Sequence, residues 1–330
     1  MGLDERGFRS LPLAGCGPLP CKPFKVKDLF RLWGILSILL GISCFKKRAF
    51  FRSIGWSLVL TGTLGLVENY PYCEPAVTIY SSVGKILPCQ RVIDYVQKKG
   101  GLVFWAHPEA RDIPRTIGPA TFLTNPYPEA LEETKEYTGF AVFHEGFKTI
   151  GPPGGIWDQL LLEYCEGKRK RPVWTIGELD YTKEGQAGTW IDTVKTIVFA
   201  RAKREDAFWE ALREGRMVAV LRTREGEITF RDFWVEDTGT GRRAQMGETL
   251  FLKAPPKINF VFSLKGKVSK VQIRLIRNGK VIQEWGDSLP LGKVYEDAAL
   301  EGSLSYYRLE AKLGDGGLLV TNPIFVSRIK

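Results

Sequence analysis

The chain has 330 residues, of which 44% are hydrophobic and 25% are charged. This composition is typical of a globular protein and excludes a disordered chain. From the length we expect two domains. The formal net charge is +10, but the basic residues are spread along the chain without an aromatic-studded basic motif. We therefore expect no nucleic-acid partner and a small-molecule substrate or ligand instead.

Cysteine and histidine are too few for the common metal motifs. The six cysteines are irregularly spaced and include no CxxC pair, which argues against a zinc ribbon. The two histidines, His107 and His144, exclude a histidine-rich cluster. Irregular cysteine spacing in a long chain favours reduced thiols and predicts a cytoplasmic location.

Residues 1–50 form an N-terminal apolar and loop segment whose role the sequence leaves open. The apolar run 32–45 lies between basic residues and is shorter than the ~20 residues of a bilayer-spanning helix. We therefore expect a buried helix or strand pair there. The less favoured alternative is a membrane-associated hairpin over residues 32–67, because the Gly and Thr content of residues 53–67 is more typical of a strand and turn.

Residues 51–225 alternate between strand-like and helix-like segments. Repeated βα units predict a mainly parallel sheet, either open or closed as a barrel. The expected strands cover residues 56–62, 76–82, 102–106, 139–143, 172–177, 193–200 and 217–221. The expected helices cover residues 89–99, 157–166 and 203–214.

Residues 226–330 change to the period of two that is typical of strands. Short apolar-alternating segments are separated by turn residues, and Asn278-Gly279 is a strong signal for a type I′ hairpin turn. No segment with helical period occurs there. This part of the chain predicts a separate all-β sandwich domain.

Polar residues follow three of the expected parallel strands. His107 follows the run "LVFWA", His144 and Glu145 follow "GFAVF", and Glu178 and Asp180 follow "PVWTIG". In a β/α barrel these strand ends share one rim, where catalytic groups gather. A structural role is the alternative for each residue: a hydrogen-bonded histidine at a strand end, or a carboxylate paired with Lys or Arg.

Several segments together resemble the polymerase-and-histidinol-phosphatase (PHP) superfamily of metal-dependent hydrolases, in its subgroup with a β-sandwich tail. The segments are "GGLVFWAHPEA", "IWDQLLLEYCEGKRKRPVWTIGELDYT", "AFWEALREGRMVAV" and the tail pieces "YYRLEAKL" and "TNPIFV". The resemblance implies a distorted β/α barrel, here incomplete, followed by an all-β sandwich. It also implies a cluster of metal ions that activates water for hydrolysis of phosphate esters.

Carried over by position, His107 takes the place of the family's His-Pro ligand and Asp180 that of its Asp-x-His aspartate. Thr182 replaces the histidine of that motif, Leu64 stands where a carboxylate is expected, and Ala76 replaces another histidine. No histidine precedes position 107, so the family's early histidine motifs have no counterpart, and we expect either an N-terminally incomplete or a degenerate relative.

The remaining groups predict at most a reduced metal site. We expect His107, Asp180, Glu178, His144 and Glu145 to hold one zinc, manganese or iron ion, or none, with His107 and Asp180 as the catalytic residues. The first functional hypothesis is a PHP-type phosphoesterase with weak or no activity. The second is a catalytically silent relative that binds a ligand or partner through the pocket or the β-sandwich.

Overall fold

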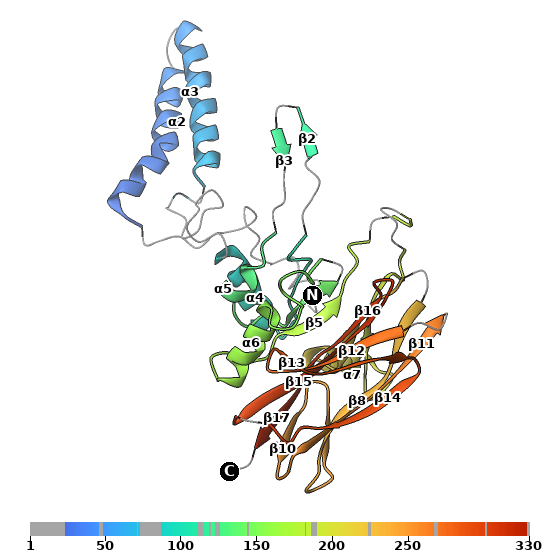
Figure 1. Ribbon diagram of the computed structural model, residues 1–330. Helices are drawn as coiled ribbons and strands as arrows, with labels where there is room; N and C mark the ends of the chain where they lie inside the picture. Colours follow the sequence, from blue (N-terminus) through green and yellow to red (C-terminus); the bar gives the residue numbers. More distant parts are fainter. Residues whose placement is uncertain are drawn as a thin grey trace. The chain divides into compact units, whose positions relative to one another are not determined.

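A computed structural model describes residues 24–45, 49–70, 72, 87–110, 115–118, 120–122, 126–143, 145–181, 183–185, 190–223, 226–266, 270–300 and 302–328. The chain forms two compact units, one over Leu3–Lys99 and the other over Gly100–Lys330 together with the first two residues. The architecture is mixed α/β, with helices first, then a small parallel sheet, and then large antiparallel sheets (Figure 1).

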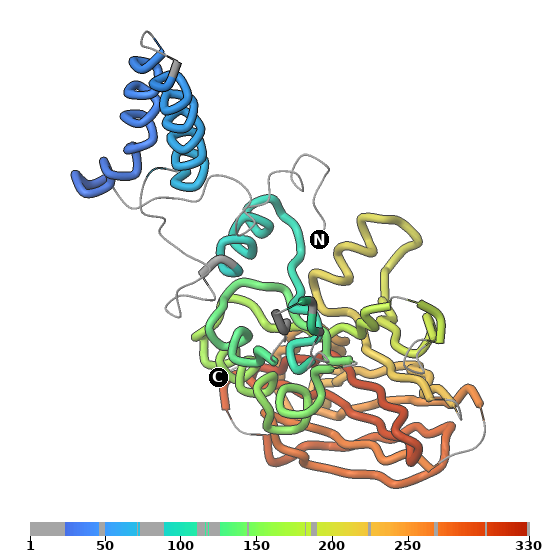
Figure 2. The backbone as a smooth tube through the Cα atoms, turned by 90° about the horizontal axis from the view of Figure 1, so that it is seen from above, coloured from blue at the N-terminus to red at the C-terminus, as the bar shows by residue number. Residues whose placement is uncertain are grey.

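The first unit contains a helical hairpin. After the 3-10 helix η1 (Val26–Leu32), helices α2 (Trp33–Cys44) and α3 (Ala49–Glu68) lie side by side in both views (Figures 1 and 2). The unit also contains α4 (Leu87–Lys98), which confirms the helix expected before Gly100. The expected strand 76–82 falls outside the described residues.

The prediction of a strand and turn over residues 53–67 is wrong, because these residues lie inside α3. Threonine disfavours a helix less when its hydroxyl bonds to the preceding turn. Thr61 Oγ1 donates to Ser57 O at 2.9 Å, and Thr63 Oγ1 donates to Val59 O at 2.8 Å. The correspondence of Leu64 with a strand-end carboxylate is wrong for the same reason.

Glycines let α2 and α3 approach closely. A Cβ atom on Gly34 would lie 2.3 Å from Gly62 O, and one on Gly41 would lie 2.6 Å from Gly55 O. Only glycine therefore fits at these positions, because the backbones of the two helices are in direct contact there. The expectation of a buried segment at 32–45 is wrong: α2 is a helix, but most of its large apolar side chains are exposed.

The second unit begins with a three-stranded parallel sheet in the order β1-β4-β5. Its apolar strands are short, and residues 139–143 are fully buried. The strands are β1 (Phe104–Trp105), β4 (Gly139–Phe143) and β5 (Trp174–Gly177), accompanied by helices α5 (Ala130–Glu133) and α6 (Ile156–Cys165) and by the small β2 (Arg115–Ile117) and β3 (Ala120–Phe122) ladder.

The parallel order ends after β5, and the described strands form no closed barrel. Strands β6 (Val194–Val198) and β7 (Met217–Leu221) pair antiparallel, with α7 (Glu205–Arg213) between them. Both strands belong to the large sheet that the tail strands continue. The expectation that they would extend a parallel sheet is therefore wrong.

The strands from residue 226 onwards form two sheets around one hydrophobic core, and the described part of this segment contains no helix. One sheet has the order β14-β11-β8-β9, and the other joins β10, β17, β15, β16, β7 and β6, with β12 and β13 added beside β15. The strands are β8 (Gly226–Asp237), β9 (Arg243–Gln245), β10 (Thr249–Leu252), β11 (Pro256–Gly266), β12 (Lys270–Arg277), β13 (Lys280–Ser288), β14 (Leu291–Glu296), β15 (Leu304–Leu313), β16 (Leu318–Thr321) and β17 (Ile324–Arg328).

The turn between β12 and β13 confirms the hairpin signal. Asn278 and Gly279 both have positive φ, at 50° and 79°, as a type I′ turn requires. Burial alternates along β8, as expected for a strand with one face on a core.

Buried polar contacts join the small parallel sheet to the large sheet. Asn322 Oδ1 accepts the N–H of Thr175 in β5 at 2.8 Å, and Asn322 Nδ2 donates to the carbonyl oxygens of Thr175 and Met217, each at 3.0 Å. Asn322 therefore fixes β5 beside β7. This contact with the β-rich part of the same unit therefore helps to position the carboxyl end of β5 and the residues that follow it.

Candidate functional site

The carboxyl ends of β1, β4 and β5 lie at one edge of the parallel sheet, because all three strands run in the same direction. His107 comes shortly after β1, and Glu178 directly follows β5. These two residues meet: His107 Nδ1 lies 3.2 Å from Glu178 Oε2. Their side chains are 30% and 28% exposed, so the pair is open to a ligand.

The carboxylate of Glu178 contacts His107 through one oxygen and the backbone of Asp180 through the other. Its second oxygen, Oε1, accepts the backbone N–H of Asp180 at 2.5 Å. An ionised Glu178 selects the His107 tautomer with the proton on Nδ1, which leaves Nε2 as the free acceptor of the ring. The arrangement can therefore accept a proton, or a hydrogen bond from a ligand, at one defined nitrogen.

The backbone at both predicted catalytic positions is unusual. His107 has φ 25° and Asp180 has φ 51°, values in the left-handed region that residues other than glycine seldom adopt. Such residues persist where surrounding contacts hold them, and they cluster at binding and catalytic sites. At this edge the contacts include the Ala110 N–H bond to His107 O at 3.0 Å and the Asp180–Glu178 bond.

Glu109 is a structural anchor of the site that the sequence analysis missed. It is 5% exposed, and its carboxylate accepts the N–H groups of Lys148 and Thr149, each at 2.7 Å, and the Thr149 hydroxyl. Glu109 thereby binds the loop that follows β4 to the segment that follows β1. The signal was present in "HPEA", because a carboxylate beside an apolar strand needs a partner when it is buried.

Of the other predicted site residues, the structure describes Asp180 and Glu145, and neither contacts the His107–Glu178 pair through its side chain. Asp180 is exposed and contacts Glu178 through its backbone N–H. Glu145 is half-buried, and its carbonyl oxygen accepts the Glu109 N–H at 3.0 Å. His144 and Thr182 lie outside the described residues, as does Ala76.

A metal cluster needs several converging ligands. In the part of the chain that the structure describes, which leaves out His144, no group of three or more His, Cys, Asp or Glu side chains could hold a metal ion. The two side chains that converge, His107 and Glu178, are bonded to each other. The described residues therefore do not fit the two- or three-metal cluster of a PHP hydrolase.

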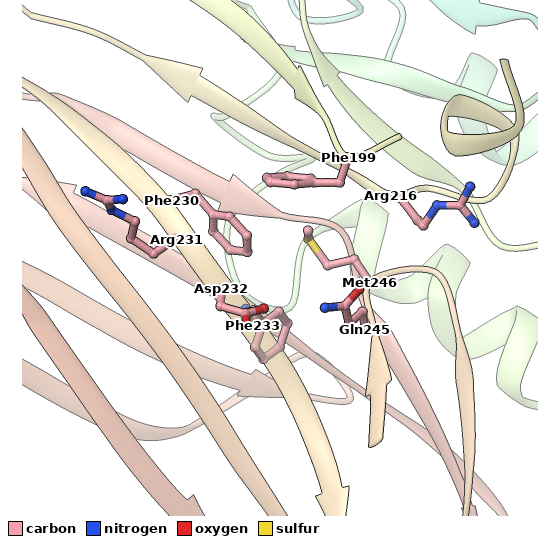
Figure 3. A pocket seen from close by; sticks show the side chains of 8 residues that line it. All are labelled: Phe199, Arg216, Phe230, Arg231, Asp232, Phe233, Gln245 and Met246. Carbon is pink, nitrogen blue, oxygen red and sulfur yellow. The ribbon is translucent and has the colours of Figure 1, made fainter. Parts of the chain in front are cut away.

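A separate small pocket of about 180 Å³ lies in the β-rich part. The side chains of Phe199, Phe230 and Met246 extend towards one another across it (Figure 3). Arg216 lines the pocket, but its guanidinium is paired with Glu214 and, at 3.2 Å, with Glu210. None of the residues that the sequence predicted for the site lines this pocket, which has apolar as well as polar and charged lining residues.

Comparison with known proteins identifies no family for this chain. No family model matches it, and no curated protein matches it. Among solved structures, the crystal structure of an engineered protein is 16% identical over 30% of this chain and 20% of that chain, with a TM-score of 0.18. The chain thus spans about a fifth of that protein's length, and a likeness of this extent establishes no shared fold.

Proposed function

We propose that residues 100–330 are a relative of the PHP hydrolases with a reduced site, in which phosphoesterase activity is weak or absent. In this proposal the parallel strands are the remainder of a distorted PHP-like barrel, and the two sheets of the tail are its β-sandwich. The observation that carries the proposal is the His107–Glu178 pair, 3.2 Å apart at the carboxyl edge of parallel strands.

The pair supports acid–base chemistry or ligand binding without further groups. Glu178 orients the imidazole, and Nε2 is then free to accept a proton from water or a hydrogen bond from a ligand. A PHP hydrolase also needs a metal-activated water and positive charge on the substrate oxygens. Since the described residues do not build that cluster, we expect the pair to support slow turnover at most.

The experiment is an assay of the purified full chain with a generic phosphomonoester, with and without added Zn²⁺ or Mn²⁺. We expect weak turnover or none, and any residual rate should disappear in His107→Ala and fall in Glu178→Gln. Arg204→Met, which removes an exposed ion pair with Asp206, is the control and should leave the rate unchanged. Robust metal-dependent turnover that His107→Ala leaves intact would place the site elsewhere.

The second candidate is a catalytically silent PHP relative that binds a ligand at the same pair. The partial exposure of both side chains favours it, because a structural pair gains nothing from staying open to solvent. Metal content after purification separates the candidates: the silent relative should carry almost none. Small-molecule binding that His107→Ala abolishes, without turnover, would support the second candidate over the first.

A further inference from the structure

The hairpin of α2 and α3 has its small side chains inside and its large apolar side chains outside. Among the described side chains of the two helices, the buried residues are all glycine or serine: Gly34, Ser37, Gly41, Gly55, Gly62 and Gly65. The exposed large side chains include Ile35, Leu36, Leu39, Leu40, Ile42, Phe50, Phe51, Ile54, Trp56, Leu60, Leu64 and Val67.

This arrangement is the reverse of a helical hairpin in water. Helices in water turn their apolar face towards a core and their polar face outwards. Here Leu36 and Leu60 are each 62% exposed, and both helices carry exposed large apolar side chains. Close packing through glycine and serine, with large apolar side chains outside, is how helices associate in lipid.

Four hydroxyl groups of the hairpin, those of Ser37, Ser43, Thr61 and Thr63, donate to backbone carbonyl oxygens of the hairpin itself. In lipid, every hydroxyl and backbone group needs a partner inside the protein. Ser37 Oγ donates across the hairpin to Leu58 O at 2.9 Å, and Ser43 Oγ donates to Leu40 O at 2.7 Å. The hydroxyls of Thr61 and Thr63 donate within α3.

We propose that α2 and α3 insert into a lipid bilayer as a helical hairpin and anchor the chain there. The 19-residue stretch Phe50–Glu68 is long and apolar enough to cross a membrane, with mean hydropathy 1.3 over an 18-residue window and 17% of that window buried. At 1.5 Å per residue it is about 28 Å long, close to the ~30 Å hydrocarbon core.

Basic residues stand at both ends of the apolar surface. Lys25, Lys27 and Arg31 precede α2, and the segment between the helices reads Lys46-Lys47-Arg48, with Arg52 following in α3. Long basic side chains reach from a helix end to the headgroups, which extends the short apolar run of α2 to the interface. Charge complementarity therefore specifies a bilayer that contains anionic lipid.

The direct test uses the purified full chain and protein-free vesicles of phosphatidylcholine and phosphatidylglycerol. We expect the chain to float with the vesicles and to stay with them after washes in high salt and alkaline carbonate. A chain that stays soluble and monomeric without detergent, and does not float, would overturn the proposal. So would a stable oligomer that ignores the vesicles, because it would mean that another copy covers the hairpin.

Substitutions on the outer surface test whether the hairpin is the anchor. An arginine at the centre of a spanning helix lowers insertion on the order of a hundredfold, so Leu39→Arg with Leu60→Arg should move the chain to the soluble fraction. The matched control is Phe251→Arg with Val294→Arg, which changes two equally exposed apolar residues of the β-rich part. Equal release by both pairs, or by neither, would contradict an anchor at α2 and α3.

A folding measurement distinguishes loss of membrane anchoring from loss of the fold. The near-ultraviolet circular dichroism of the chain reports the packed aromatic residues of the β-rich part, such as Phe260 and Trp285 with ring centroids 5.0 Å apart. This signal should be the same in the wild type and in both pairs of variants. The proposal is independent of the His107–Glu178 site, so loss of anchoring should leave any ligand binding there unchanged.

Discussion

Several buried charged residues in the second unit form ion pairs, and the pair that joins α6 to β15 is the most enclosed of them. Asp158 and Arg308 have side chains that are 1% and 0% exposed, and Arg308 donates to both oxygens of Asp158, at 2.7 and 2.6 Å. The Tyr306 hydroxyl donates to Asp158 Oδ1 at 2.8 Å. Burial, together with the charge of Asp158, raises the pKa of Tyr306 well above its usual value. The tyrosine therefore remains a donor.

Removing one partner of this pair should strongly destabilise the protein. Arg308→Met leaves the Asp158 carboxylate buried without its counter-charge, which costs about 3–5 kcal/mol of unfolding free energy. Denaturant unfolding should show a lower midpoint at an unchanged slope. Arg204→Met is the control, because its ion pair with Asp206 is 70% and 69% exposed and is worth at most about 1 kcal/mol. Equal losses in the two variants would show that the buried pair contributes little.

At the level of residues, strand ends were predictable and side-chain partners were not. An apolar run followed by His-Pro placed His107 correctly after a strand, and "PVWTIG" did the same for Glu178. The direction of a carboxylate depends on groups brought in from elsewhere in the chain. For this reason Glu109 went unnoticed as an anchor, and Asp180 was not expected to bond through its backbone.

Individual elements follow local signals where local chemistry decides the structure. The Asn278-Gly279 turn is an example, because only residues that tolerate positive φ fit its two central positions. The helix α7 also formed as its pattern indicated, with Glu205 and Asp206 in its first turn. The pairing of β6 with β7 could not be read locally, since a buried strand has the same apolar composition in parallel and antiparallel sheets. Likewise, the glycines of α3 are explained by the close approach of the partner helix, whereas its threonines bond to carbonyl oxygens of the preceding turn.

The turn also packs against α6, which makes Gly279 sensitive to substitution. Gly279→Ala introduces a Cβ at φ 79°, 3.2 Å from the Asp158 Cβ, so both backbone strain and crowding oppose it. Left-handed backbone alone costs an L-residue about 1–2 kcal/mol. Gly241→Ala is the matched control, because its φ is 69° and no atom lies within 4 Å of the added Cβ. We expect Gly279→Ala to lose more unfolding free energy than Gly241→Ala in the same denaturant titration, and an equal loss would mean that the contact with Asp158 is easily relieved.

At the scale of the whole molecule, the two units have different relations to solvent. The second unit has a large apolar core shared by both sheets, whereas the helical hairpin of the first unit turns its apolar side chains outwards. The amino-acid composition of the complete chain includes both units, and it is therefore typical of an ordinary globular protein. From the sequence, a membrane-associated hairpin over residues 32–67 was the less favoured alternative, because apolar residues were expected to be buried. The arrangement of α2 against α3 shows that most of the large apolar side chains lie outside.

A chain that lacks residues 24–70 should therefore keep the fold of residues 100–330 and lose the need for detergent. The core of the β-rich part contains no residue of the hairpin, so its unfolding free energy should stay within about 1 kcal/mol of the full chain, as expected for changes at independent sites. Both chains should be unfolded in the same mild detergent, with near-ultraviolet circular dichroism as the signal. The shortened chain should then remain monomeric when the detergent is removed, whereas the full chain should aggregate, because its outward apolar surface has no lipid to cover it. A large drop in the unfolding midpoint of the shortened chain would show instead that the hairpin supports the fold, and aggregation of both chains would place the exposed apolar surface outside α2 and α3.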